Sequence, residues 1–195
     1  MPHLQSEEYY FQENPNHLGW IEVICGSMFS GKTEELIRRI NRAVIAKQPV
    51  KIFKPIIDTR YHASDIVSHT ENSKQGTAIQ KATEIIALVK KGDIIAIDEC
   101  QFFGEEILDV CAHLANQKHR VIVAGLDSDS KGKPFGYMPQ LMAMAEFVSK
   151  LHAICSVCGS MASFTYRTAG EADAILIGAG ESYQARCRNC FNKKI

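Results

Sequence analysis

The chain alternates short apolar runs with stretches whose apolar residues recur at helical spacing. Four of the short runs have the length and composition of buried strands. They are WIEVIC (20–25), VKIF (50–53), DIIAID (93–98) and RVIVAG (120–125). Helical spacing begins at Thr33 and returns at 83–91 and 105–118. This alternation predicts an α/β fold, with a mostly parallel sheet that has helices on both faces.

The pattern changes in the second half of the chain. Residues 126–139 contain two glycines and two prolines, which predicts a loop, and a helix at 140–148 and a strand at 149–154 are expected to follow. From Cys155 the sequence changes to cysteines, glycines and short strands. We therefore expect a tail, an α/β domain and a small C-terminal domain, at 1–18, 19–154 and 155–195.

Composition and charge narrow the class of protein. The chain has 195 residues, of which 46% are hydrophobic and 23% charged, as in an ordinary globular protein. Lys and Arg number 22, as do Asp and Glu, and this balance argues against a broad nucleic-acid-binding surface. No apolar run approaches the roughly 20 residues that span a membrane, and the polar N-terminal segment lacks the pattern of a signal peptide. We expect a cytoplasmic protein without a membrane partner, in which disulfides are rare.

A phosphate-binding loop follows the first predicted strand. The segment GSMFSGKT fits the pattern G-x-x-x-x-G-K-[ST], with a strand before it and a helix after it. The glycines let backbone N–H groups converge on phosphate oxygens, and the start of the helix adds a positive dipole. The lysine reaches the β- and γ-phosphates, and the threonine hydroxyl is offered to Mg²⁺. The predicted ATP- and magnesium-binding residues of this loop are Gly26, Ser27, Met28, Phe29, Ser30, Gly31, Lys32 and Thr33.

Two adjacent acidic residues end the third predicted strand. A P-loop enzyme needs an acid on a neighbouring strand to hold the Mg²⁺ shell, and Asp98 has that position. The next residue, Glu99, can position water in an ATPase or accept the proton of an attacking hydroxyl in a small-molecule kinase. It can also form a structural ion pair. The spacing alone leaves these alternatives open.

Four of the seven cysteines form two C-x-x-C pairs near the C-terminus. Two such pairs offer four thiolates to one ion, which is the ligand set of a closed tetrahedral site for structural Zn²⁺. Residues 159–186 separate the pairs, more than the roughly 15–20 residues of a compact ribbon, so something longer than a hairpin lies between them. The alternative is a redox role for either pair. The predicted metal ligands are Cys155, Cys158, Cys187 and Cys190.

Six segments, taken together, point to one family. They are GSMFSGKTEEL, DTRY, IDECQFFG, GLDSDSKGKPFG, SFTYR and ILIGAGESYQARC, in that order over residues 20–190. This set resembles the zinc-containing thymidine kinase family of bacteria and animal cytosol. The resemblance implies ATP-dependent phosphorylation of the 5′-hydroxyl of thymidine, and of deoxyuridine, for nucleotide salvage. It also implies a RecA-like P-loop domain, a small zinc-ribbon-like domain, a homotetramer and feedback inhibition by thymidine triphosphate.

The resemblance also implies roles for individual residues. Glu99 would be the general base, while Asp98 and Gln101 would belong to the nucleotide and Mg²⁺ site. Asp58 and Arg60 would lie near the metal and the phosphates. A lasso-like loop, anchored by zinc at both ends, would close over the base and exclude water. The implied substrate-binding residues are Met28, Leu126, Phe135, Thr165, Ala174, Ile175, Leu176, Ile177, Gly178 and Tyr183.

One departure from the family pattern concerns the base. This chain has Ser130 where the family has an aromatic residue, which would weaken base packing by roughly 1 kcal/mol unless another residue fills the gap. Two other classes of function stay open, a zinc-containing P-loop ATPase that acts on nucleic acid and a non-catalytic nucleotide sensor. The neutral charge argues against the first. The intact Lys32, Thr33, Asp98 and Glu99 argue against the second.

Overall fold

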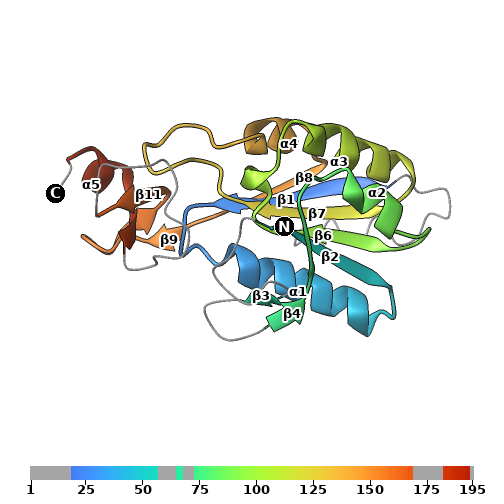
Figure 1. Ribbon diagram of the computed structural model, residues 1–195. Coiled ribbons are helices and arrows are strands. Elements are labelled where there is room, and N and C mark those ends of the chain that lie inside the picture. The colour runs from blue at the N-terminus through green and yellow to red at the C-terminus, as the bar shows by residue number, and fades with distance from the viewer. Residues whose placement is uncertain (1–18, 57–64, 68–72, 169–181, 194–195) are drawn as a thin grey trace, which may run out of the picture.

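A six-stranded sheet forms the centre of the molecule in the computed structural model (Figure 1). The structure describes residues 19–56, 65–67, 73–168 and 182–193. The sheet order is β5-β2-β6-β7-β1-β8, and all five neighbouring pairs in it are parallel. The predicted α/β fold is therefore confirmed. The six strands are β1 (Trp20–Gly26), β2 (Val50–Pro55), β5 (Thr77–Ile79), β6 (Ile94–Ile97), β7 (Arg120–Gly125) and β8 (Phe147–Leu151).

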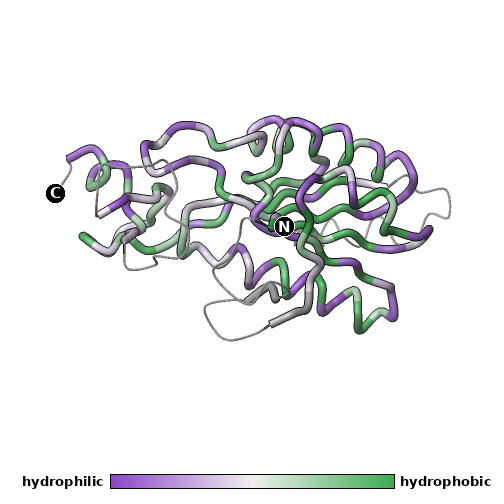
Figure 2. Tube along the Cα trace, viewed as in Figure 1, coloured by the Kyte–Doolittle hydropathy of each residue, from purple (hydrophilic) through white to green (hydrophobic). Residues whose placement is uncertain are grey.

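Helices cover both faces of this sheet (Figure 1). On one face lies α1 (Lys32–Ile45), and on the other lie α2 (Glu84–Leu88), α3 (Glu106–Asn116) and α4 (Met138–Met144). Alternate strand residues supply the two cores, so that Ile24 of β1 packs with α1 while its neighbours face the other helices. The central strands β1, β6 and β7 are consequently mostly apolar along their length, whereas the edge strand β8 contains exposed residues (Figure 2). Every helix in the described part of the chain is too short or too polar to cross a membrane.

The start of the last strand of the sheet differs from the sequence prediction. A helix was expected at 140–148, but α4 begins earlier, at Met138, because Pro139 fits the first turn of a helix. Phe147 and Val148 are not helical and instead pair with β1 as the start of β8. Sheet pairing with a distant strand overrides the local helical pattern here.

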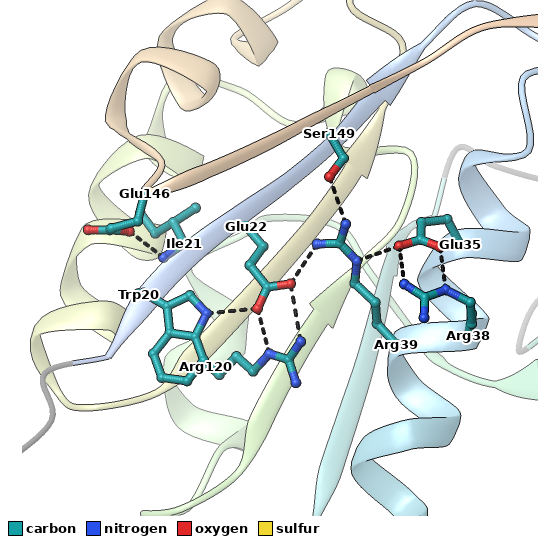
Figure 3. A network of polar contacts seen from close by, with 9 residues as sticks. All are labelled: Trp20, Ile21, Glu22, Glu35, Arg38, Arg39, Arg120, Glu146 and Ser149. Atoms are coloured by element: carbon teal, nitrogen blue, oxygen red, sulfur yellow. Dashed lines mark hydrogen bonds and ion pairs between the residues drawn. The ribbon is translucent and has the colours of Figure 1, made fainter. Parts of the chain in front are cut away.

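A buried ion-pair network fastens α1 to the sheet (Figure 3). Glu22 of β1 is buried and accepts hydrogen bonds from Arg39 of α1 and Arg120 of β7, each at 2.6 Å. Arg39 also donates to Glu35 of its own helix and to Ser149 of β8, both at 2.8 Å. Burial alone raises the pKa of Glu22, but the hydrogen bond and charge of Arg120, the hydrogen bond from Trp20 and the charge of Arg39 outweigh it and hold the pKa below its usual value. The network therefore joins one helix to three strands, β1 and β7 through the Glu22 carboxylate and β8 through Arg39.

A small C-terminal unit follows β8. In it, β9 (Ala153–Ile154) pairs with β10 (Met161–Ala162), and β11 (Phe164–Arg167) pairs with β12 (Tyr183–Arg186), both antiparallel. The ring of Phe191, on α5 (Arg188–Asn192), stacks on Phe164 with 4.8 Å between centroids. The buried apolar residues described for this unit are all alanines and cysteines, which bury little area. Its stability must therefore come largely from aromatic stacking and from the cysteine site described below.

A third antiparallel pair lies outside the main sheet. It consists of β3 (Asp65–Val67) and β4 (Ser73–Gln75), in the region between β2 and β5. In Figure 1 this pair is drawn on the same side of the main sheet as α1.

Candidate active site

The phosphate loop lies between the end of β1 and the start of α1. Gly26 and Gly31 have φ values of 143° and 86°, which residues with a side chain rarely adopt. At Gly26 a side chain would also lack room, since a Cβ would lie 2.3 Å from the carbonyl oxygen of Leu151. Gly31 is the N-cap of α1 and has no side chain to cap it. The first N–H groups of the helix therefore point to where a phosphate can bind.

Two side chains of the loop brace its own backbone. Ser30 Oγ and Lys32 Nζ both donate to the carbonyl oxygen of Ser27, at 2.8 and 2.9 Å. The Lys32 ammonium is thereby held over the loop, within reach of phosphates that the N–H groups bind.

Asp98 lies next to the phosphate loop, directly after β6. It is buried, and its Oδ2 is 3.5 Å from the hydroxyl of Thr33. Its Oδ1 accepts a hydrogen bond from the N–H of Glu99 at 2.9 Å. A hydroxyl and a carboxylate side by side are hard oxygen ligands, which is the donor set that Mg²⁺ takes from a P-loop enzyme. These residues therefore fit a magnesium ion that binds with ATP.

Glu99 has an unusual backbone conformation. Its φ of 51° and ψ of 39° lie in the left-handed region, which costs a residue with a side chain about 1–2 kcal/mol. The short helix η2 (Cys100–Phe102) starts directly after it. Gln101 Nε2 donates to Glu99 Oε2 at 2.5 Å, and the N–H of Leu126 donates to Gln101 Oε1 at 3.0 Å. The carboxylate of Glu99 is thus held from the ends of two neighbouring strands, β6 and β7.

The loop after β7 borders the same end of the sheet. The ring of Phe135 packs edge-on against Phe102, with 5.7 Å between centroids. The N–H of Phe135 donates to the carbonyl oxygen of Asp127 at 3.2 Å. The Asp127 carboxylate is nearly buried, and its Oδ2 lies 2.7 Å from Nζ of Lys150 on β8. These contacts hold Phe135 beside η2 and tie the loop to β8.

One hydrogen bond joins the phosphate loop to the C-terminal unit. The N–H of Met28 donates to Thr165 Oγ1 at 3.0 Å, and Thr165, on β11, is buried. In the same hairpin, Tyr183 pairs with Arg167 across the two strands. Met28 and Thr165, both predicted to bind the substrate, are therefore in contact although 137 residues separate them.

The four predicted metal ligands lie together in the C-terminal unit. Their Sγ atoms all lie within 4.8 Å of one another, and those of Cys158 and Cys187 are 3.6 Å apart. In a tetrahedral site with Zn–S bonds of about 2.3 Å, neighbouring sulfurs are about 3.8 Å apart. Gly159 (φ 74°) turns the chain directly after Cys158, and the N–H of Cys190 points at Cys187 Sγ at 3.5 Å. Together with Cys155, this donor set fits a structural zinc ion.

The other three cysteines are buried in the α/β part of the chain. Burial raises the pKa of Cys25 to about 11 and that of Cys111 to about 12, and it raises the pKa of Cys100 well above its usual value. Such thiols stay protonated at neutral pH and behave as small apolar side chains. Cys100 is therefore a packing residue, although it is adjacent to Glu99.

Two sets of predicted site residues lie outside the described residues. Asp58 and Arg60 fall within 57–64, and the segment Ala174, Ile175, Leu176, Ile177 and Gly178 falls within 169–181. Their expected roles stay predictions.

Two features of the site were not evident from the sequence. One is the pair of Asp127 and Lys150, although an acid shortly after a buried strand, as at Asp98, is a recognisable signal. The other is the contact of Gln101 with Glu99, since the expected role of Gln101 was in the nucleotide site. The sequence carries no local signal for this second contact, because the direction of a side chain is set by its surroundings.

Comparison with known proteins identifies the family to which the chain belongs. A model of the thymidine kinase family matches residues 19–191. The thymidine kinase of Rhodothermus sp. (strain ITI 518) is 54% identical over 174 residues, which cover 89% of this chain and 82% of that protein. Thymidine kinases of Bacteroides thetaiotaomicron and Bacteroides fragilis (strain YCH46) are 54% and 53% identical, over 89% and 91% of this chain and 87% and 89% of theirs. Among solved structures, the Thermotoga maritima RuvB Holliday junction branch migration motor aligns with a TM-score of 0.41 at 11% identity, over 69% of this chain and 38% of that one, which is too weak to carry an argument.

Proposed function

The chain belongs to the thymidine kinase family and phosphorylates thymidine in nucleotide salvage, and we propose that Glu99 is the general base for the 5′-hydroxyl. The observation that carries this proposal is the position of Glu99. It follows directly on Asp98, whose carboxylate lies 3.5 Å from Thr33 of the phosphate loop, and Gln101 holds its side chain. The 5′-oxygen bonds to the γ-phosphorus as the bond to ADP breaks, and its proton passes to Glu99.

The other groups of the site bind and orient ATP. The N–H groups of the loop and of the start of α1 cradle the phosphates, and Lys32 offsets the charge on the β- and γ-phosphates. Thr33 and Asp98 would hold the Mg²⁺ that binds with ATP, and this ion would supply positive charge that stabilises the phosphoryl group during transfer. We further propose, from the family resemblance alone, that Asp58 and Arg60 help to bind the metal and the phosphates. These residues act through position and charge, so the chemistry needs no covalent intermediate on the protein.

We place thymidine between the loop after β7 and the C-terminal unit. This is the carboxyl end of the parallel strands, where α/β sheets bind their ligands. The contact of Met28 with Thr165 and the packing of Phe135 beside η2 support this placement. The cysteine-bound zinc anchors both ends of a lasso over the base and takes no part in the chemistry. The proposed pocket residues are Met28, Leu126, Phe135, Thr165, 174–178 and Tyr183.

Family membership supports several further parts of the proposal. Deoxyuridine, which lacks only the methyl group of thymine, is a second substrate, and thymidine triphosphate is a feedback inhibitor. The enzyme is a homotetramer of the cytoplasm and does not bind nucleic acid. A kinase assay measures the first two properties, and sedimentation gives the oligomeric state.

The direct test of the activity is incubation of the protein with MgATP and a panel of nucleosides, followed by chromatography of the products. We expect thymidine monophosphate to form only with Mg²⁺ present. A product from another nucleoside, with none from thymidine, would overturn the assignment. DNA-stimulated ATP hydrolysis without nucleoside phosphorylation would instead indicate the nucleic-acid-dependent ATPase, which the family match argues against.

Glu99→Gln tests the base. The glutamine keeps the size of the side chain but cannot take up the proton, so we expect kcat to fall by about 10²–10⁴ while thymidine and MgATP still bind. The matched control is Glu105→Gln, which removes the same charge from an exposed position nearby and should leave kcat within about twofold. Unchanged turnover in Glu99→Gln would exclude Glu99 as the base.

A further inference from the structure

Gln101 is closely packed, and both its side chain and its backbone are in contact with neighbouring segments. It is 3% exposed and bridges Glu99 and Leu126 by hydrogen bonds of 2.5 and 3.0 Å. Two glycines make room for it. A Cβ on Gly125 would lie 2.7 Å from Gln101 Oε1, and a Cβ on Gly136 would lie 2.4 Å from the Gln101 carbonyl oxygen. The surrounding chain thus leaves the side chain little freedom to turn elsewhere.

The polarity of the bridge suits an amide. An ionised carboxylate only accepts hydrogen bonds, and the backbone N–H of Leu126 only donates. The amide of Gln101 must therefore turn its NH₂ group to Glu99 and its oxygen to Leu126, since the flipped amide would set oxygen against oxygen and N–H against N–H. A glutamate here would face Glu99 with a second carboxylate. A methionine would leave both partners without this hydrogen bond.

We propose that Gln101 is a positioning residue for thymidine phosphorylation, which holds the Glu99 carboxylate in the direction needed for proton transfer. The inference rests on the proposed role of Glu99 as the base. A glutamate side chain has three rotatable bonds, so without a second contact its carboxylate samples several directions. The bond from Gln101 restricts them before the substrate binds, which is how preorganisation raises a rate. Gln101 then serves the base, while Thr33 and Asp98 serve the metal.

A double-mutant cycle tests this role. Gln101→Glu and Gln101→Met are each made alone and together with Glu99→Gln. In the otherwise native enzyme we expect either change to lower kcat by about tenfold or more, with KM for thymidine and MgATP within about threefold. In the Glu99→Gln background the same changes should alter kcat by less than about twofold, because no base is left to position.

Cys100→Ala is the matched control, since Cys100 is the neighbouring buried residue of η2 and should leave kcat nearly unchanged. Gln101→Glu keeps a hydrogen-bond acceptor for the N–H of Leu126. If Gln101→Met does not fold, the Gln101→Glu variant still tests whether Gln101 positions Glu99. Full turnover in the Gln101 variants, or an equal loss with and without Glu99, would overturn the inference. So would a raised KM for MgATP at unchanged kcat. Full turnover in Glu99→Gln alone would overturn the proposed base first.

Discussion

At the scale of the residue, Ser130 lies in a turn that Asp129 organises. The Oδ1 of Asp129 accepts hydrogen bonds from the N–H groups of Lys131 and Lys133, at 2.9 and 2.8 Å. Beside it, Gly132 lies close to the C-terminal unit, since a Cβ there would be 3.2 Å from the ring of Phe191. Asp129 therefore stabilises the turn from within, and the C-terminal unit packs close to it at Gly132. Ser130, in this turn, occupies the position where the family pattern has an aromatic residue.

Ser130→Phe should tighten thymidine binding by about fivefold, because an aromatic face against the base is worth roughly 1 kcal/mol. Titration calorimetry with thymidine measures the Kd. Ser130→Ala is the control and should leave the Kd nearly unchanged, since it adds no aromatic face. A weaker Kd in the phenylalanine variant would show that the pocket is shaped around the serine.

At the scale of the element, the position of α1 matters because this helix carries Lys32 and Thr33. Arg39 is a little under two turns further along, and its bonds to Glu22 and Ser149 tie the helix to the strands (Figure 3). The spacing of apolar residues from Thr33 predicted this helix, and its polar positions include Arg38 and Arg39. Only the structure shows that one of these arginines is buried against the sheet while its neighbour, Arg38, is half exposed.

Glu22→Gln should lower the free energy of unfolding by about 3–5 kcal/mol at pH 7, because it leaves Arg39 and Arg120 opposite an uncharged partner. Arg38→Met removes an exposed ion pair and should lower it by less than about 1 kcal/mol. Urea unfolding followed by the fluorescence of the single tryptophan, Trp20, measures both.

The difference between native protein and Glu22→Gln should shrink in acid. Glu22 has a pKa below its usual value, so it stabilises the fold above the unfolded value of about 4.3, and that stability is lost as the pH falls below it. The pKa of Glu35 is also low, about 2, because Arg38 donates a hydrogen bond to it and Arg39 lies beside it. Since Glu35 is present in both the native protein and Glu22→Gln, its titration does not contribute to the difference between them. A difference that stays constant from about pH 6 to about pH 3 would contradict this account.

At the scale of the whole molecule, the C-terminal unit contacts two loops at the carboxyl end of the sheet. Thr165 accepts the N–H of the phosphate loop at Met28, and Gly132 of the β7 loop approaches Phe191. The unit has a core of small residues, so a metal ion at its four cysteines would stabilise it substantially. The zinc ion is therefore expected to act on catalysis from a distance, by keeping Thr165 and the lasso in place.

Removal of zinc should abolish most thymidine phosphorylation, and added Zn²⁺ should restore it. Activity is measured after chelation, with metal content determined alongside and excess Mg²⁺ returned to every sample. A matched sample that receives chelator already saturated with zinc shows whether the chelator itself inhibits. Full activity in zinc-free protein would contradict the anchoring role.

The sequence by itself determined the parts of this protein whose geometry is local. Apolar runs predict the strands and GSMFSGKT predicts the phosphate loop, because the residues involved lie close along the chain. The cysteines predict the metal cluster although the two pairs are far apart, because each C-x-x-C pair offers two thiolates to one ion. Family motifs added the activity. Each of these sequence patterns favours one local structure or one ligand, and the folded protein has the structure that the pattern favours.

The tertiary structure alone decided the contacts between distant segments. Phe147 and Val148 are strand because β1 lies beside them, Gln101 turns to Glu99 because Leu126 and two glycines surround it, and Met28 meets Thr165 only when the C-terminal unit docks. Side-chain direction and strand pairing depend on neighbours that folding brings from elsewhere in the chain, and local sequence does not encode those neighbours.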